Sequence, residues 1–291
     1  MPIAFLPREQ CPLCRSPSRA ELCDLDFGEA PLAGFLERFY GGRIPTAALA
    51  GARYRVVACR ECGFIYQANV LDDEGMQALY RDWVDQDVSL AKKQAAGHKL
   101  YRQYAGHLQT LQRLVDKPPA QTRVLDFGMG WGYWVRMAQA HGFDACGFEL
   151  SSRRREHAAG MGVKSLDRLP GEPVFDFIIA NQVFEHLPDP IASLQEVAAC
   201  LNPGGMLYLR VPDGRGVRQR LQRQGWRDDL NAVHPLEHIN CFTRASLVRL
   251  GATAGFRPIP TPLRLQWGSL VGGIRREIAD RWFSPHVLFT R

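Results

Sequence analysis

The chain has 291 residues, 46% hydrophobic and 23% charged, which fits one or two globular domains and excludes a fibrous or disordered chain. No apolar stretch is long enough to cross a bilayer, and no basic segment followed by an apolar one opens the chain, so we expect a soluble, cytoplasmic protein without a membrane partner. The net charge of +6 is modest and not gathered in one block, so an anionic partner is permitted but not required.

Four of the eight cysteines form two C-x-x-C pairs, Cys11 with Cys14 and Cys59 with Cys62. Two such pairs supply the four thiolates of a closed tetrahedral zinc site, and this site leaves no open position for catalysis. The sequence therefore predicts a structural zinc ion and a zinc-binding module over residues 1–70. Four unrelated core cysteines are the alternative interpretation.

Residues 71–118 carry apolar side chains at spacings of three and four, which predicts helices that end at Lys117-Pro118-Pro119. We expect this segment to be a helical linker that covers a cofactor pocket. Its aromatic side chains Trp83, Tyr101 and Tyr104 either contribute to that cover or belong to the core.

From residue 119 to residue 291 the pattern alternates between strand and helix. Strands are expected at 123–127, 145–150, 175–180, 206–211 and 285–291, and helices at 134–142, 152–162, 189–201 and 242–255. Strands that alternate with helices indicate an α/β domain with a doubly wound, mostly parallel sheet.

A glycine-rich turn follows the first of these strands, and a carboxylate, Asp126, lies just before it. Glycines at alternate positions let the backbone turn sharply and approach a ligand closely. Glu149 ends the next strand, where an acidic side chain can accept the ribose hydroxyls of an adenosine group. A related turn serves NAD-dependent dehydrogenases, but Asp126 suits a charged amino group, and the bulk of Trp131 disfavours a pyrophosphate.

The run VLDFGMGWG at 124–132 resembles motif I of class I S-adenosylmethionine-dependent methyltransferases. FDFIIANQVFEHLPDP resembles their fourth strand and the loop after it, and LNPGGMLYLRVPD resembles their fifth strand. The resemblance implies a Rossmann-like domain with a seven-stranded sheet and S-adenosyl-L-methionine as the cofactor. It also implies a set of cofactor contacts: Asp126, Gly128, Gly130, Gly132, Glu149, Leu150, Asn181 and Gln182.

The N-terminal cysteine pairs make the chain similar to bacterial sugar C-methyltransferases, although their C-terminal domain has no counterpart here. We therefore expect a small polar acceptor, a sugar or a nucleotide sugar. Resembling enzymes that methylate nucleobases carry an N-P-P-Y type sequence in the loop after the fourth strand. This chain has ANQVFEH there, which disfavours a nucleobase as the acceptor. An RNA methyltransferase whose zinc module docks nucleic acid is the alternative, and a non-enzymatic zinc-containing binding protein is a third interpretation.

Candidate catalytic residues follow the fourth and fifth strands. His238 is a possible general base, with the adjacent Glu237 to orient it, because a histidine titrates near neutral pH. His186 follows the fourth strand in a Glu-His step that resembling families share. A purely structural role is the alternative for both histidines.

Overall fold

The computed structural model describes residues 3–260 and 285–291, which divide into two compact units. Unit 1 is formed by Met1–Lys92, Glu185–Pro190 and Pro212–Thr243, and unit 2 by Lys93–Phe184, Ile191–Val211 and Arg244–Arg291. Each unit is therefore assembled from three separate stretches of chain. The boundaries expected from the sequence, at residues 70 and 118, remain a prediction about domains.

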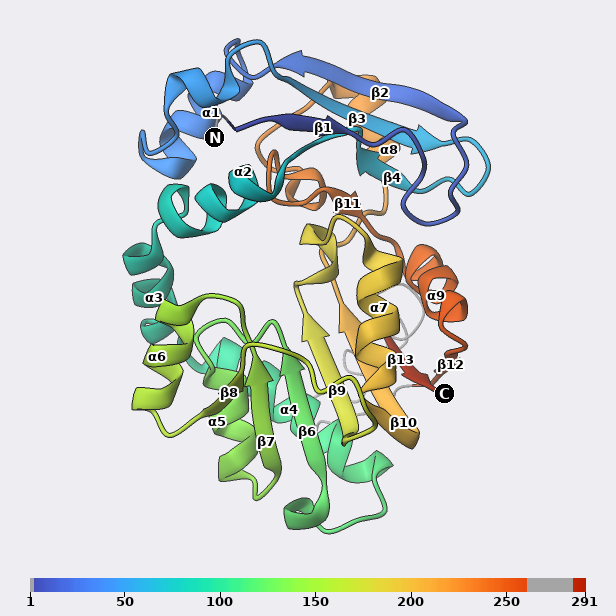
Figure 1. Ribbon diagram of the computed structural model, residues 1–291. Coiled ribbons are helices and arrows are strands. Elements are labelled where there is room, and N and C mark those ends of the chain that lie inside the picture. The colour runs from blue at the N-terminus through green and yellow to red at the C-terminus, as the bar shows by residue number, and fades with distance from the viewer. Residues whose placement is uncertain (1–2, 261–284) are drawn as a thin grey trace, which may run out of the picture. The chain divides into compact units, whose positions relative to one another are not determined.

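Unit 2 contains a seven-stranded sheet with the order β12-β13-β10-β9-β6-β7-β8 (Figure 1). The strands are β6 Arg123–Phe127, β7 Asp144–Phe148, β8 Lys164–Leu166, β9 Phe175–Asn181, β10 Leu201–Arg210, β12 Arg257–Ile259 and β13 His286–Thr290. The five strands from β8 to β10 run parallel, and β13 joins β10 antiparallel at Met206↔Thr290 through Arg210↔His286. This arrangement confirms the predicted doubly wound, mostly parallel fold.

The helices of unit 2 precede the first of these strands or lie between them along the chain. They are α4 His98–Leu114, α5 Tyr133–Ala140, α6 Ser152–Gly160, α7 Pro190–Ala199 and α9 Arg244–Thr253, and α3 Gln86–Gln94 precedes them. Buried side chains of α4 and α5, such as Leu108, Leu111 and Val135, pack against Val124 and Ile179 of the central strands. Of the apolar stripes predicted for residues 71–118, the one on α4 thus helps to bury one face of the sheet, whereas Leu79 and Trp83 pack in the core of unit 1.

Unit 1 contains an antiparallel sheet with the order β11-β4-β3-β2 and a separate two-stranded ribbon of β1 and β5. The strands are β1 Phe5–Pro7, β2 Arg19–Asp26, β3 Arg53–Cys59, β4 Ile65–Gln67, β5 Asn69–Leu71 and β11 Asn240–Cys241. The helices are α1 Leu32–Tyr40, α2 Asp73–Ala78 with a π-helical turn at Leu79–Trp83, and α8 Val217–Gln224. Short 3₁₀ turns lie at Thr46–Leu49, Pro119–Gln121, Phe184–His186 and Asn231–Val233 across the two units.

The core of unit 1 joins residues from opposite ends of the chain. Phe35, Tyr54 and Trp83 pack in one cluster with Leu221 of α8 and with Trp226. The late segment Pro212–Thr243 therefore completes the fold of the N-terminal region. None of the described helices is long and apolar enough to span a membrane.

Candidate functional site

The glycine-rich turn of unit 2 begins at the end of β6 and leads into α5. Gly128, Gly130 and Gly132 have φ angles of 75°, 56° and 79°, which side-chain-bearing residues rarely adopt. The amides of Gly128 and Met129 donate to the carbonyl of Phe148 at 2.9 and 3.0 Å. A Cβ on Gly130 would meet no described atom within 4 Å, so the backbone here is open to a ligand.

Glu149 follows β7 and is tied to the turn. Its Oε2 accepts from the Gly130 amide at 3.0 Å, and its Oε1 accepts from the Ser151 amide at 2.9 Å. An ionised carboxylate accepts about four hydrogen bonds, so capacity remains for a ligand hydroxyl. The next residue, Leu150, is 74% exposed.

Asp126 is a buried carboxylate near the same turn. The pKa of Asp126 is raised to about 7, chiefly by burial, with Lys93 of α3 opposing the shift and Glu149 adding to it. Its environment in unit 2 also includes Tyr104 of α4, whose own pKa is raised by burial and by Asp126. A buried carboxylate with a raised pKa is stabilised in its charged form by an added cation, so this position suits an ammonium group.

The end of β9 provides a second polar position in unit 2. The Asn181 side-chain oxygen is buried and accepts no hydrogen bond from the described residues. Gln182 is exposed, has φ of 61°, and its amide donates to the Arg210 carbonyl at 2.8 Å. A buried acceptor of this kind is costly unless a ligand or water satisfies it.

In unit 1, Glu185, His186 and His238 form a group that we call the His–Glu cluster. One ligand-type atom from each lies within 4.8 Å of the others. His186 Nδ1 lies 2.9 Å from the Glu237 carbonyl oxygen and 2.9 Å from the Tyr80 hydroxyl. His238 Nδ1 is hydrogen-bonded to the Asn231 carbonyl. Carbonyl oxygens only accept, so both imidazoles carry a proton on Nδ1, and in the neutral ring the lone pair lies at Nε2.

The Glu237 carboxylate lies close to two further side chains of unit 1. Its carboxylate accepts from the Tyr40 hydroxyl at 2.8 Å and lies 3.9 Å from His234 Nδ1. The group that holds the His238 ring is the carbonyl of Asn231. Burial lowers the pKa of His238 to about 4, so the neutral imidazole prevails at pH 7.

Sequence reasoning missed the residues that fix these loops. Gln67 of β4 is buried, and its side-chain amide donates to the carbonyls of His234 at 2.8 Å and His238 at 3.1 Å. Tyr80 contacts His186 from the π-helical turn. Neither residue belongs to a motif with recognisable spacing, so no signal in the sequence singled them out.

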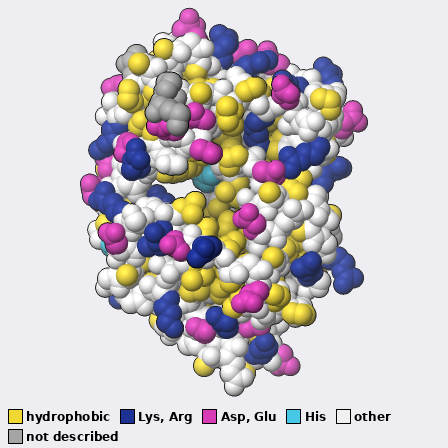
Figure 2. All heavy atoms as spheres, viewed as in Figure 1, with side chains coloured by type: hydrophobic (Ala, Val, Ile, Leu, Met, Phe, Trp, Pro, Cys, Tyr) yellow, Lys and Arg dark blue, Asp and Glu magenta, His cyan; other side chains and the backbone are white. Residues whose placement is uncertain are grey.

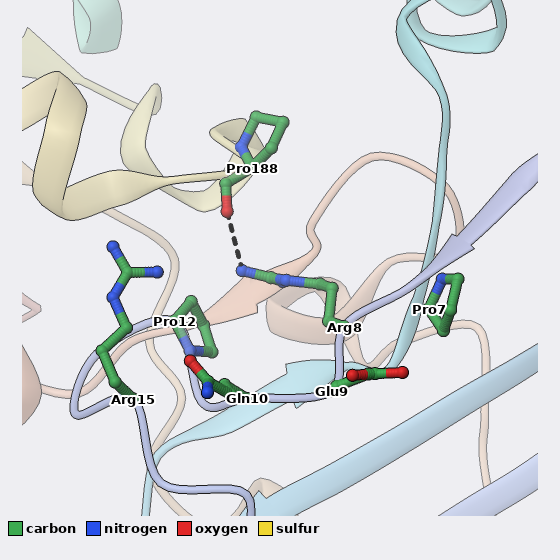
Figure 3. A pocket seen from close by; sticks show the side chains of 7 residues that line it. All are labelled: Pro7, Arg8, Glu9, Gln10, Pro12, Arg15 and Pro188. Carbon is green, nitrogen blue, oxygen red and sulfur yellow. Dashed lines mark hydrogen bonds between the residues drawn. The ribbon is translucent and has the colours of Figure 1, made fainter.

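Arg8 connects the N-terminal segment with two distant loops. Its guanidinium donates to the carbonyls of Pro188 at 3.0 Å and Ile239 at 3.1 Å and to Asn240 Oδ1 at 2.9 Å, and Figure 3 shows the first of these bonds. It borders a cavity of about 370 Å³ lined by Pro7, Arg8, Glu9, Gln10, Pro12, Arg15 and Pro188. Arg15, on the same wall, pairs with Asp189 at 2.7 Å. Both arginines therefore serve the loop structure, and the cavity contains none of the predicted site residues.

The four paired cysteines come together in unit 1, with two buried and two partly buried. Cys11 Sγ lies 3.6 Å from Cys62 Sγ, and Cys14 Sγ lies 3.5 Å from Cys59 Sγ. A tetrahedral ion with zinc–sulfur bonds of about 2.3 Å separates its sulfurs by roughly 3.8 Å. The Leu13 amide also points to Cys11 Sγ at 3.4 Å. These spacings fit the donor set of a structural zinc ion.

Three comparisons with known proteins bear on this geometry. A family model described as a methyltransferase domain matches residues 96–261. The ubiquinone biosynthesis O-methyltransferase of Xanthomonas axonopodis pv. citri is 32% identical over 103 residues, which cover 31% of this chain and 43% of that protein. The biotin biosynthesis bifunctional protein BioHC of Cellvibrio japonicus is 29% identical over 157 residues, which cover 50% of this chain and 30% of that protein.

The chain thus spans less than half the length of these two curated relatives. Among solved structures, the plantazolicin methyltransferase BpumL in complex with SAH is similar with a TM-score of 0.51 at 14% identity. The similar region covers 74% of this chain and 93% of that one. At this identity the likeness supports the fold alone.

Proposed function

Because the chain belongs to the methyltransferase-domain family, we propose that it transfers the methyl group of S-adenosyl-L-methionine to a small polar acceptor, a sugar or nucleotide sugar. The observation that carries this proposal is the edge of the unit 2 sheet where Asp126, the open Gly130 backbone and Glu149 lie together. Ligands of open α/β sheets bind at this edge, outside the carboxyl ends of the strands.

Each residue at the edge has a proposed task. Asp126 holds the amino group of the methionine part, and the backbone of Gly128, Gly130 and Gly132 accommodates the cofactor closely. Glu149 accepts the ribose hydroxyls, with Leu150 beside it. Asn181 and Gln182 bind the methionine part, and the buried Asn181 oxygen supports this role because it needs a donor. When bound, the cofactor supplies a methyl group already activated on a sulfonium.

We propose His238, His186 and Glu237 as the catalytic residues that act on the acceptor. A neutral imidazole with its lone pair at Nε2 can take the proton of an acceptor hydroxyl. Glu237 acts on this group indirectly, since its backbone carbonyl holds the His186 ring. Relatives named as O-methyltransferases support a hydroxyl oxygen as the acceptor atom.

We propose that Cys11, Cys14, Cys59 and Cys62 bind one structural zinc ion, and that residues 1–70 form the module around it. The two sulfur–sulfur separations and the amide directed at Cys11 support this assignment. The ion would stabilise unit 1 by joining the segment before β2 to the turn after β3. With four thiolate ligands it would contribute no open position to catalysis.

The test is calorimetric titration of the protein with S-adenosylhomocysteine, with wild type, Asp126→Ala and Glu172→Ala compared. We expect binding by wild type and by Glu172→Ala, whose carboxylate is exposed, and a loss of at least about tenfold in Asp126→Ala because a charge-assisted hydrogen bond is removed. Absence of binding by wild type would contradict the proposed function.

The acceptor is identified by screening methyl transfer to nucleotide sugars against short RNAs. Figure 2 shows basic and acidic side chains interspersed over the visible face, without a continuous basic surface there. We expect transfer to the nucleotide sugars, because the N-terminal cysteine pairs resemble those of sugar methyltransferases. Salt-sensitive transfer to RNA would support the RNA methyltransferase alternative instead.

A further inference from the structure

The His–Glu cluster gathers three metal-ligand groups from two distant stretches of unit 1. Glu185 and His186 follow β9, whereas His238 lies in the loop before β11. The Glu185 side chain is only 1% exposed, and its Oε1 lies 3.8 Å from His186 Nε2. Their ligand-type atoms all fall within 4.8 Å of one another.

The hydrogen bonds around the two imidazoles fix what these rings present to each other. His186 Nδ1 and His238 Nδ1 both face backbone carbonyls, those of Glu237 and Asn231. Both rings therefore keep their proton on Nδ1 and offer an electron pair at Nε2. Two such nitrogens and a buried carboxylate form an electron-rich donor set, which a cation would stabilise.

We propose that Glu185, His186 and His238 bind a divalent transition-metal ion, at a site separate from the four cysteines. Two imidazoles and one carboxylate are a common donor set for first-row ions such as zinc, iron(II) and manganese. Ligating histidines usually donate their second ring nitrogen to a carbonyl, and both histidines here already do so. The carbonyls of Glu237 and Asn231 are thus the supporting contacts of the site.

The geometry needs only a small adjustment. An ion about 2.1 Å from each ligand atom requires ligand separations of roughly 3 to 3.5 Å. The 3.8 Å between Glu185 and His186 is close to this range, and side-chain movements of roughly 1.3 to 1.8 Å would close the widest separation that 4.8 Å allows. Tyr80, hydrogen-bonded to His186 Nδ1 at 2.9 Å, limits how far that ring turns.

Three protein ligands leave coordination positions open, unlike the closed cysteine site. The remainder of the inference rests on the proposed function. An ion at this place would orient a polar acceptor and lower the pKa of its hydroxyl, whose proton passes to solvent. His186 and His238 would then act as ligands, and the ion would replace a direct base in activating the acceptor.

The test counts ions in the full chain. Protein stripped of metal is titrated with cobalt(II), and wild type is compared with Glu185→Gln, His238→Gln, Cys14→Ser and the control His98→Gln, whose side chain is exposed. Thiolate-to-cobalt absorption reports the cysteine site, and total cobalt after desalting reports both sites. Manganese(II), which prefers oxygen and nitrogen ligands, is then titrated into protein whose cysteine site already holds zinc.

We expect two cobalt ions in wild type and in His98→Gln, but only the thiolate-bound ion in His238→Gln and Glu185→Gln. Changes outside the ligand set already weaken binding by about 10–100-fold, so loss of a ligand should weaken manganese binding at least as much. Retention of the thiolate-bound cobalt in these variants shows that unit 1 has folded. Cys14→Ser should lose the thiolate absorption and keep the second ion.

One ion per wild-type chain, or a second ion that survives both His238→Gln and Glu185→Gln, would overturn the inference. Titration with S-adenosylhomocysteine separates this result from a failure of the proposed function. If the protein binds the cofactor but no second ion, only the proposed metal site is refuted. If it binds a second ion but no cofactor, the metal site stands and the proposed methyltransferase function is refuted.

Discussion

At the residue scale, Asp126 exposes a conflict between binding and stability. Its pKa is raised to about 7 in the folded protein, against an ordinary value of 3.8. Between these values the folded chain holds a proton that the unfolded chain has lost, so this group makes the folded state less stable as the pH rises. A carboxylate kept at such a position is expected where a ligand supplies the missing charge.

We therefore predict that Asp126→Asn stabilises the ligand-free protein at pH 8 and abolishes tight cofactor binding. One pKa unit corresponds to about 1.4 kcal/mol, so the gain at pH 8 should be roughly 2–4 kcal/mol, and it should fall toward zero near pH 4. Urea unfolding of wild type and variant at several pH values measures it. A difference in unfolding free energy that does not change with pH would contradict the buried-charge explanation.

The sequence located the carboxylates of unit 2 but not the contacts that hold the histidines of unit 1. Asp126 lies near the end of β6 and Glu149 directly follows β7, and their places at one sheet edge are a consequence of parallel topology. The Asn231 and Glu237 carbonyls that fix His238 and His186 are backbone atoms, which every residue carries. Chain proximity suggested the Glu237 side chain as the partner of His238, which stays a prediction, and it gave no sign of the hydrogen bond that Tyr40 donates to the same carboxylate.

At the element scale, β7 determines the position of the glycine-rich turn. Gly147 lies opposite Asp126 in the β6–β7 register. A Cβ on Gly147 would lie 2.1 Å from Met129 Sδ and 2.7 Å from Met129 Cβ, so an added methyl group would push against the turn itself. The turn is thus packed on β7 as well as connected to β6.

We predict that Gly147→Ala lowers the free energy of unfolding by roughly 1–3 kcal/mol, as overpacking usually does, and weakens cofactor binding because Met129 moves. Gly160→Ala at the end of α6 is the matched control, since its Cβ would meet no described atom within 4 Å. Chemical denaturation and titration with S-adenosylhomocysteine measure the two effects. Equal stability of the two variants would show that the turn adapts freely.

Periodicity predicted the elements of unit 2 well because each depends on its own local pattern. The apolar run of β9, buried from Phe175 to Ala180, reads as a central strand, and the strand expected at 285–291 appears as β13. Asn202-Pro203-Gly204-Gly205, read as a turn, instead lies within β10 at a shift in register between Leu201 and Met206. The register gives residues 202–205 no Cα partner in β9, and Gly204 has φ of 74°, so the local turn preference persists as an irregularity within the strand.

At the scale of the whole molecule, the chain passes between the units several times. Residues 185–190 and 212–243 interrupt the chain of unit 2 and belong to unit 1. Strand β11 pairs with β4 through Asn240↔Tyr66 and Cys241↔Ile65, partners that lie far apart in the chain. A two-residue strand has no periodicity, so the sequence alone did not predict that the segment after β10 belongs with the N-terminal region.

This organisation predicts two separable responses to ligands in a calorimetric scan. S-adenosylhomocysteine binds the residues proposed in unit 2, so at 100 times its dissociation constant it should stabilise that unit by about 2.7 kcal/mol. Metal chelation acts on the cysteines and the His–Glu cluster of unit 1 and should lower the melting temperature of that unit alone. Cys14→Ser should reproduce the second effect without changing the first. If both treatments instead shift one common transition, the crossings of the chain couple the units, and metal loss in unit 1 would then weaken cofactor binding in unit 2.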